Sequence, residues 1–164
     1  GLRCVMARAM QADHSLELGT ATGYSAIYLG RACLPKGGRV LSLEYDAAMA
    51  ERARRNLAQA DLSAIVTVRE GDALELLSHP QDMGGPYDLV FMDIEKIDYI
   101  RALEPLERLV RPSGLLIADN TAFKDADAFN QAIQKSSSWH SVQLFSYLPL
   151  HSGLYDGLCF AVRR

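Results

Sequence analysis

The chain has 164 residues, of which 49% are hydrophobic and 23% are charged, and its formal net charge is -3. This length and composition are typical of one folded domain with a sizeable core, so we expect a single domain over residues 1–164. The small negative charge excludes a general electrostatic attraction to nucleic acid or to an anionic membrane. No apolar run approaches the roughly 18 residues of a membrane span, so we expect no membrane partner.

Short apolar runs alternate with helix-like stretches along most of the chain. The runs cover residues 15–18, 39–43, 65–69, 87–92 and 114–118, and the helix-like stretches that follow them cover 23–34, 47–60, 72–79, 96–110 and 125–136. Two further strand-like runs, 141–148 and 157–163, have no helix between them. This order predicts an α/β, Rossmann-like, doubly wound sheet of about seven strands, mostly parallel with the last strand antiparallel.

Acidic or amide side chains stand at, or just beyond, the end of each of the first five strand-like runs. Glu17 lies in the first run, Glu44 ends the second, and Asp72, Asp93 and the pair 119–120 (Asp119 and Asn120) follow the other three. One or two of these side chains, Asp72 above all, could instead cap a helix N-terminus. Five of them together, at the edge where open α/β sheets bind ligands, predict a functional site.

The turn after the first strand-like run, LELGTATGYS, contains Gly19 and Gly23, which allow a tight turn and the close approach of a ligand. A dinucleotide-binding fingerprint would require glycine at position 21 and glycine or alanine at position 24. Ala21 and Tyr24 occupy these positions, and a large tyrosine where helix and strand must pack closely disfavours a nicotinamide-dependent oxidoreductase. Together with Glu44, placed to bind ribose hydroxyls, the turn favours a ligand with ribose and adenine but no phosphates, such as S-adenosylmethionine.

Seven segments extend over nearly the whole chain: LELGTATGYSA, VLSLEYD, REGDALELL, YDLVFMDIEKIDY, GLLIADN, FN at 129–130 and DG at 156–157. In this order and spacing they resemble the class I S-adenosylmethionine-dependent methyltransferases and, within them, the cation-dependent O-methyltransferases. That group includes catechol and caffeoyl-CoA O-methyltransferases and their bacterial relatives.

The resemblance implies which residues bind S-adenosylmethionine. The residues that match contacts to its methionine and ribose parts are Glu17, Gly19, Thr20 and Ser25. Glu44 matches the carboxylate that binds the ribose hydroxyls. Asp72 and Ala73 match the two residues that line the adenine. Gly23 of the turn and Asp93 complete the expected cofactor pocket.

The resemblance also implies a metal site and a catalytic pair. Asp93, Asp119 and Asn120 match the three protein ligands of a divalent cation, and they offer only oxygen atoms. Such ligands favour Mg²⁺, with Mn²⁺ or Ca²⁺ as other occupants, and disfavour zinc. Lys96 matches the lysine proposed as general base in the catechol branch, so we expect Lys96 and Asp93 to be catalytic.

These residues predict an enzyme that transfers the methyl group of S-adenosylmethionine to a hydroxyl of a small phenolic or catechol-like acceptor. Two alternatives stay open. Some bacterial relatives methylate a hydroxylated wobble uridine of tRNA, although the net charge of -3 disfavours nucleic acid as a partner. A degenerate member could also bind the cofactor and serve only as an interaction module.

Other features of the chain set further expectations. Cys4, Cys33 and Cys159 have no CxxC spacing, which favours free, buried thiols and a cytoplasmic location. The helices that relatives place before the first strand are nearly absent, so we expect a trimmed chain or an unusually open acceptor pocket. Because those helices often build a dimer, a homodimer stays an option. The histidines are expected at the surface or in structural positions, with His151 near the pocket, and Trp139 in the core.

Overall fold

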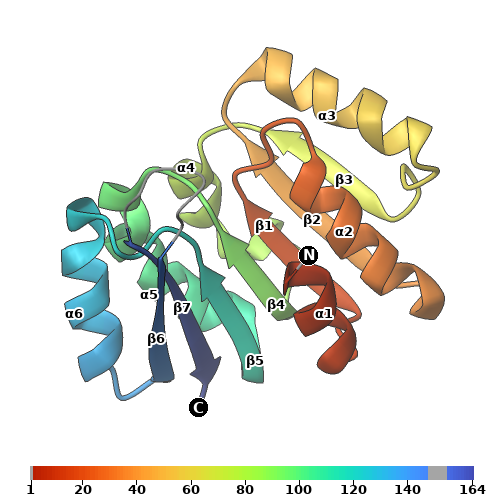
Figure 1. Cartoon of the computed structure of the whole chain (residues 1–164). Coiled ribbons are helices and arrows are strands. Elements are labelled where there is room, and N and C mark those ends of the chain that lie inside the picture. Colours follow the sequence, from red (N-terminus) through yellow and green to blue (C-terminus); the bar gives the residue numbers. More distant parts are fainter. Residues whose placement is uncertain (1, 148–154) are drawn as a thin grey trace.

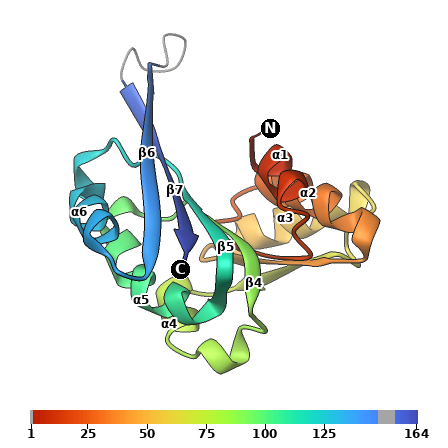
Figure 2. The ribbon, with the colours of Figure 1, turned by 90° about the horizontal axis from the view of Figure 1, so that it is seen from below.

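The structure is a computed structural model that describes residues 2–147 and 155–164 (Figure 1). The described residues form one seven-stranded sheet with the strand order β3-β2-β1-β4-β5-β7-β6. The strands are β1 His14–Leu18, β2 Arg39–Glu44, β3 Val66–Glu70, β4 Tyr87–Met92, β5 Val110–Ala118, β6 Trp139–Tyr147 and β7 Tyr155–Arg163. Strands β1 to β5 pair in parallel, whereas β7 lies between β5 and the edge strand β6 and runs antiparallel to both (Figure 2). The predicted fold class is confirmed.

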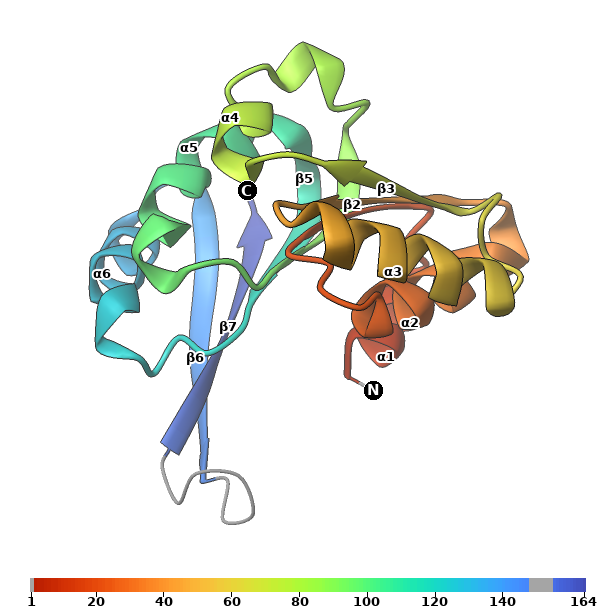
Figure 3. The same cartoon turned by 90° about the horizontal axis from the view of Figure 1, so that it is seen from above.

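Helices cover both faces of this sheet. The α-helices of the described chain are α1 Leu2–Ala9, α2 Tyr24–Cys33, α3 Ala47–Gln59, α4 Ala73–Leu77, α5 Tyr99–Leu109 and α6 Asp127–Lys135. Seen from above, α1, α2 and α3 lie on one side, and α5 and α6 lie on the other (Figure 3). The five predicted helices are all present but shorter than expected, partly because 3₁₀ turns at Lys96–Asp98 and Lys124–Ala126 replace the first turns of α5 and α6.

The core consists of one apolar layer on each face of the sheet. The layer under α1, α2 and α3 contains fully buried alanines, such as Ala26 and Ala53, which let these helices approach the sheet closely. The layer under α4, α5 and α6 contains larger side chains, including Phe129 and Trp139. Trp139 is buried, so its predicted core position is confirmed.

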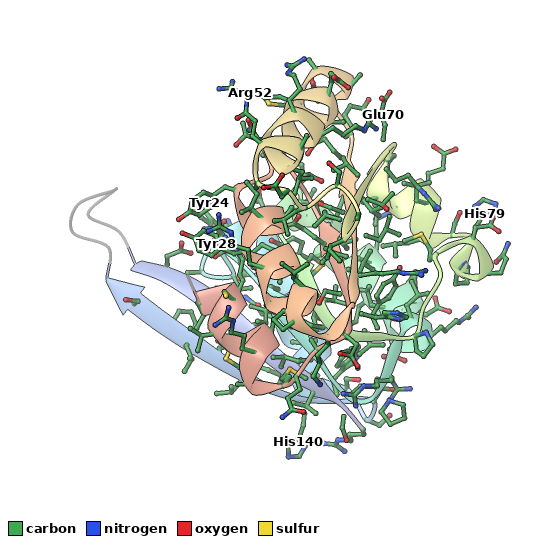
Figure 4. All side chains as sticks on the ribbon, turned by 90° about the vertical axis from the view of Figure 1, so that its right-hand side faces the viewer. Tyr24, Tyr28, Arg52, Glu70, His79 and His140 are labelled. Carbon is green, nitrogen blue, oxygen red and sulfur yellow. The ribbon has the colours of Figure 1, made fainter. Side chains whose placement is uncertain are left out.

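The remaining expectations about single residues concern the surface. His14, His79 and His140 are exposed, and Figure 4 shows the last two at the periphery of the molecule. His151 lies outside the described residues. The three cysteines are free thiols, as predicted, but only Cys33 and Cys159 are buried, whereas Cys4 is half-buried. In the described part of the chain, no helix has both the length and the apolar character that crossing a bilayer requires.

Backbone hydrogen bonds continue the parallel pairing one residue beyond the strands. The Gly19 amide donates to the carbonyl of Leu43 at 3.0 Å, and the Asp93 amide donates to that of Leu18 at 2.8 Å. The Asp119 amide donates to the carbonyl of Met92 at 3.0 Å. The loops after β1, β4 and β5 therefore leave the sheet from adjacent positions on one edge, as the sequence predicted for the strand-end acids.

Tyr99, the first residue of α5, ties two of these strand ends together. Its hydroxyl lies 3.1 Å from the carbonyl oxygen of Met92 and 2.9 Å from that of Asp119. Its ring packs edge-on against Phe129, with 5.5 Å between the ring centroids. Burial, and then the charge of Asp93, raise the pKa of Tyr99, so the hydroxyl keeps its proton and acts as a donor.

Tyr99→Phe is expected to lower the free energy of unfolding by about 1–3 kcal/mol, because the carbonyl oxygens of Met92 and Asp119 would lose a buried donor. Urea denaturation followed by circular dichroism measures this change. Tyr45 is 78% exposed, so Tyr45→Phe is the control and should change the free energy by less than about 0.5 kcal/mol. If both variants matched the wild-type protein, the bridging role of Tyr99 would be refuted.

Candidate functional site

A cavity of about 780 Å³ opens at the carboxyl ends of β1 to β4. From the loop after β1 and the first turn of α2, the predicted residues Gly19, Thr20 and Ser25 line it. From the end of β2 and the segments that follow β3 and β4, the lining includes Glu44, Asp72, Ala73, Asp93 and Lys96. The volume lies within the range of about 300–1,000 Å³ that is typical of small-molecule sites. The structure thus brings most of the predicted site residues together around one space.

The glycines of the first turn allow this cavity to form. Gly19 has a φ of +95°, and a Cβ atom there would lie 2.2 Å from the carbonyl oxygen of Asp93. Any side chain at position 19 would therefore push apart the loops after β1 and β4. Gly23 has a φ of +85° and packs against Ala53 of α3, where a Cβ atom would approach the Ala53 Cβ to 3.2 Å. Gly23 shapes the turn without lining the cavity.

Tyr24 does not lie at the close contact between helix and strand that the sequence suggested for it. Its side chain is 64% exposed, and it lies beside Tyr28 on the surface of α2 (Figure 4). Gly23 and Ala53, and not Tyr24, form the close contact between this turn and α3. The predicted position of Tyr24 is therefore wrong, and its bulk does not disfavour a dinucleotide.

The carboxylate of Glu44 supplies a better reason against a bound phosphate. Its Oε2 accepts hydrogen bonds from the backbone amides of Thr20 at 3.1 Å and Ala21 at 2.7 Å, and its Oε1 accepts one from Asp46 at 3.0 Å. The amides that would otherwise face a phosphate are thus already paired with a negative group. Oε2 already accepts two hydrogen bonds, whereas Oε1 accepts one and keeps a further lone pair, so Glu44 can both hold the turn and accept a hydroxyl donor through Oε1.

Glu17 is fully buried and lies behind the cavity wall. Ser42 donates to its Oε2 at 2.5 Å and also lies 2.5 Å from the hydroxyl of Thr20, which lines the cavity. Its Oε1 has no hydrogen-bond partner among the described residues. Burial raises the pKa of Glu17 from 4.5 to about 7, although Ser25, Ser42 and Arg3 act in the opposite direction. A buried carboxylate oxygen without a partner suits a positively charged ligand group.

Asp72 serves as the N-cap of α4, which was the structural alternative for this residue. Its Oδ1 accepts hydrogen bonds from the backbone amides of Leu74 at 2.7 Å and Glu75 at 3.2 Å. The same residue lines the cavity beside Ala73. Its carboxylate is therefore engaged with the helix, while its position forms part of the wall.

After β4 and after β5, a carboxylate is paired with a basic side chain. The Nζ of Lys96 lies 2.8 Å from Asp93 Oδ1, and a guanidinium nitrogen of Arg3 lies 2.9 Å from Asp119 Oδ2. Burial, and then the charge of Asp93, raise the pKa of Asp119, whereas Arg3 lowers it. The two carboxylates follow β4 and β5, which pair in parallel with Met92 opposite Ala118, so they stand on neighbouring strand ends.

Asp119 faces a second, smaller cavity of about 220 Å³. Arg3 and Tyr24 line this cavity as well as the larger one, so the two spaces adjoin.

The loop after β5 is held by residues from two of the short sequence segments, FN and DG. Asn120 has a φ of +54°, and its amide nitrogen donates to Asp156 at 2.7 Å. The Thr121 amide donates to the Gly157 carbonyl at 2.9 Å, and Asn130 donates to the Thr121 carbonyl at 2.8 Å. The bond to Asp156 leaves the amide oxygen of Asn120 for another partner.

The side chains of Asp93, Asp119 and Asn120 fit a hard cation in their chemistry. They provide only oxygen donors, and they follow the neighbouring strands β4 and β5. Within residues 2–147 and 155–164, no group of three or more His, Cys, Asp or Glu side chains is arranged to hold a metal ion. A cation at this place would therefore depend on the amide oxygen of Asn120 as its third protein ligand.

Sequence reasoning missed two residues of the site. Arg3 lies 116 positions from Asp119, and no spacing rule relates the two. Ser42 connects Glu17 with Thr20, and its signal was present: a lone polar side chain within the apolar run of β2. A polar residue inside a buried strand usually has a hydrogen-bonding partner, and here it has two.

Comparisons with known proteins agree with this geometry. The profile of the O-methyltransferase family matches residues 3–144. A catechol O-methyltransferase from Niastella koreensis is 42% identical over 117 residues, which cover 71% of this chain and 52% of that protein. The catechol O-methyltransferase of Bos taurus is 33% identical over 156 residues, which cover 92% of this chain and 56% of that protein. This chain thus spans about half the length of the curated relatives it matches.

The likeness extends to solved structures. An O-methyltransferase from Bacillus cereus in complex with SAH superposes with a TM-score of 0.90 at 29% identity, covering 99% of this chain and 79% of that one. The sheet order, the strand-end cavity and the match over residues 3–144 lead to the same conclusion: the chain belongs to the O-methyltransferase family.

Proposed function

We propose that this protein transfers the methyl group of S-adenosylmethionine to a hydroxyl of a small catechol-like acceptor, with a divalent cation at the acceptor site. The observation that carries the proposal is that three groups lie together at the carboxyl ends of the parallel strands. These are the buried Glu17, the turn held by Glu44, and the carboxylates Asp93 and Asp119 at the ends of the paired strands β4 and β5. The SAH in the Bacillus cereus relative and the catechol O-methyltransferases among the relatives support it.

The residues around the first turn would bind S-adenosylmethionine. The unpartnered Oε1 of Glu17 would balance its ammonium group, and Glu44 would accept from its ribose hydroxyls. The residues that would line the methionine, ribose and adenine parts are Gly19, Thr20, Ser25, Asp72, Ala73 and Asp93, with Gly23 keeping the turn tight. Because the carboxylate of Asp72 caps α4, we propose that Asp72 contacts the adenine through its place in the cavity wall and not through its carboxylate.

The acceptor end would work through Asp93, Asp119, Asn120 and Lys96. The first three would hold the cation, which is Mg²⁺ or, alternatively, Mn²⁺ or Ca²⁺. When bound, a divalent cation supplies positive charge that lowers the pKa of a neighbouring acceptor hydroxyl. Lys96, whose Nζ lies 2.8 Å from Asp93 Oδ1, would take the hydroxyl proton as the general base.

The proposal predicts methyl transfer to catechols that depends on the cation. Excess chelator should abolish transfer, and added Mg²⁺ or Mn²⁺ should restore it. Asp93→Ala should lower kcat/KM by on the order of 100-fold or more, because it removes a ligand and leaves Lys96 without its partner. Glu104→Ala, at an exposed position of α5, is the control and should leave the rate unchanged.

The same assay, run with catechols, hydroxycinnamoyl thioesters and tRNA, separates the alternatives. Full activity in excess chelator would refute the cation dependence. Methylation of tRNA alone would favour the wobble-uridine activity. Binding of S-adenosylmethionine without transfer to any acceptor would favour a member that serves only as an interaction module.

Binding of S-adenosylmethionine is also expected to release protons near pH 6.5. Because burial raises the pKa of Glu17 to about 7, most of this carboxyl is protonated at that pH. A ligand ammonium beside it would favour the ionised form and expel the proton. At pH 8.5 Glu17 is already ionised, so its contribution to the release should disappear.

Calorimetry in buffers of different ionisation enthalpy measures the number of protons released. Glu17→Gln is the matched variant, since it keeps the shape of the side chain but cannot ionise. It should bind more weakly and should lose the release at pH 6.5. The same release from Glu17→Gln would assign the proton to another group and refute the role of Glu17.

A further inference from the structure

Arg3 stands between the two cavities and belongs to none of the seven sequence segments. It lies in the first turn of α1, and its side chain lines both spaces. Its guanidinium lies 2.9 Å from Asp119 Oδ2 and stacks over the ring of Phe91, 3.8 Å from the ring centroid. The Arg3 and Asp119 side chains are only 24% and 22% exposed, so water screens this ion pair weakly.

The charges around Arg3 indicate that it occupies a place suited to a cation. Asp93 and Asp119 are neutralised by two single positive charges, those of Lys96 and Arg3. A divalent cation between the same carboxylates would bring the same total charge. Two positive groups a few ångströms apart repel each other, so Arg3 at Asp119 opposes the entry of a cation.

We propose that Arg3 is a resident counter-ion that competes with the divalent cation for Asp119. Cation binding then requires the guanidinium to leave Asp119, which loosens one contact between α1 and the end of β5. This inference rests on the cation site of the proposed function and adds to it a residue that sets the affinity of the site.

A purely structural role for Arg3 predicts a different effect of its removal on the affinity for the cation. If the ion pair only anchored α1, removal of Arg3 would leave cation binding unchanged or weaken it. If Arg3 competes, removal of its charge frees Asp119 and tightens binding. Arg3→Met keeps an unbranched apolar side chain but removes the charged group that stacks on Phe91, and Arg3→Gln removes the charge but keeps a hydrogen-bond donor.

Titration of the metal-free protein with Mn²⁺, followed by electron paramagnetic resonance of the free ion, tests the proposal. Arg3→Met and Arg3→Gln should each bind Mn²⁺ about tenfold more tightly than the wild-type protein, which corresponds to about 1.4 kcal/mol. Arg3→Lys keeps the charge and should stay within about threefold of the wild-type affinity. Arg8→Met changes an exposed arginine on the same helix and should have no effect.

Thermal unfolding provides a second readout that needs no methyl transfer. In chelator, Arg3→Met should unfold at a lower temperature than the wild-type protein, because Asp119 has lost its counter-ion. With saturating Mn²⁺ this difference should vanish, since the cation takes over that role.

The possible outcomes separate this inference from the proposed function. Equal or weaker Mn²⁺ binding by both charge-removing variants overturns the role of Arg3 and leaves the cation site standing. Failure of every protein to bind Mn²⁺ overturns both. Methyl transfer, measured separately on the wild-type protein, reports on the proposed function alone.

Discussion

Carboxylates that gather at one edge of a parallel sheet must be balanced by positive charge or by hydrogen-bond donors, and this constraint shapes the whole site. The structure meets it in a different way for each group. Glu44 lies at the mouth of the cavity and accepts three backbone amides. Asp93 and Asp119 are half-buried and pair with basic side chains. Glu17 is fully buried and has a pKa raised to about 7, so near neutral pH much of it is uncharged.

These arrangements differ in how readily a ligand can replace them. The amides on Glu44 belong to the turn itself, so that pairing persists when a ligand binds. In the two proposals, the proton on Glu17 gives way to the ammonium group of the cofactor and Arg3 on Asp119 gives way to a cation, whereas Lys96 stays beside Asp93. Tyr99 matters here because it fixes the carbonyls behind two of these acids while their partners change.

Much of this architecture follows from local sequence patterns. Apolar runs predicted the strands, and residues placed just after parallel strands necessarily share an edge, so Glu44, Asp93 and Asp119 could be grouped from their spacing alone. Contacts between distant segments followed no such pattern. Arg3 reaches Asp119 only because α1 packs beside the sheet, and Tyr24 was misplaced because the sequence does not tell which side of α2 faces the core at its first turn.

The most direct test of the account asks whether the cation and S-adenosylmethionine bind next to each other at the carboxyl ends of the strands. The protein would be loaded with Mn²⁺ and with S-adenosylmethionine carrying ¹³C in its methyl group, and the hyperfine coupling would be recorded by pulsed electron–nuclear double resonance. If the cation lies at Asp93 and Asp119 beside the cofactor cavity, a resolved ¹³C coupling is expected. Bound Mn²⁺ and bound S-adenosylmethionine with no such coupling would contradict the account, because the two ligands would then occupy separate places.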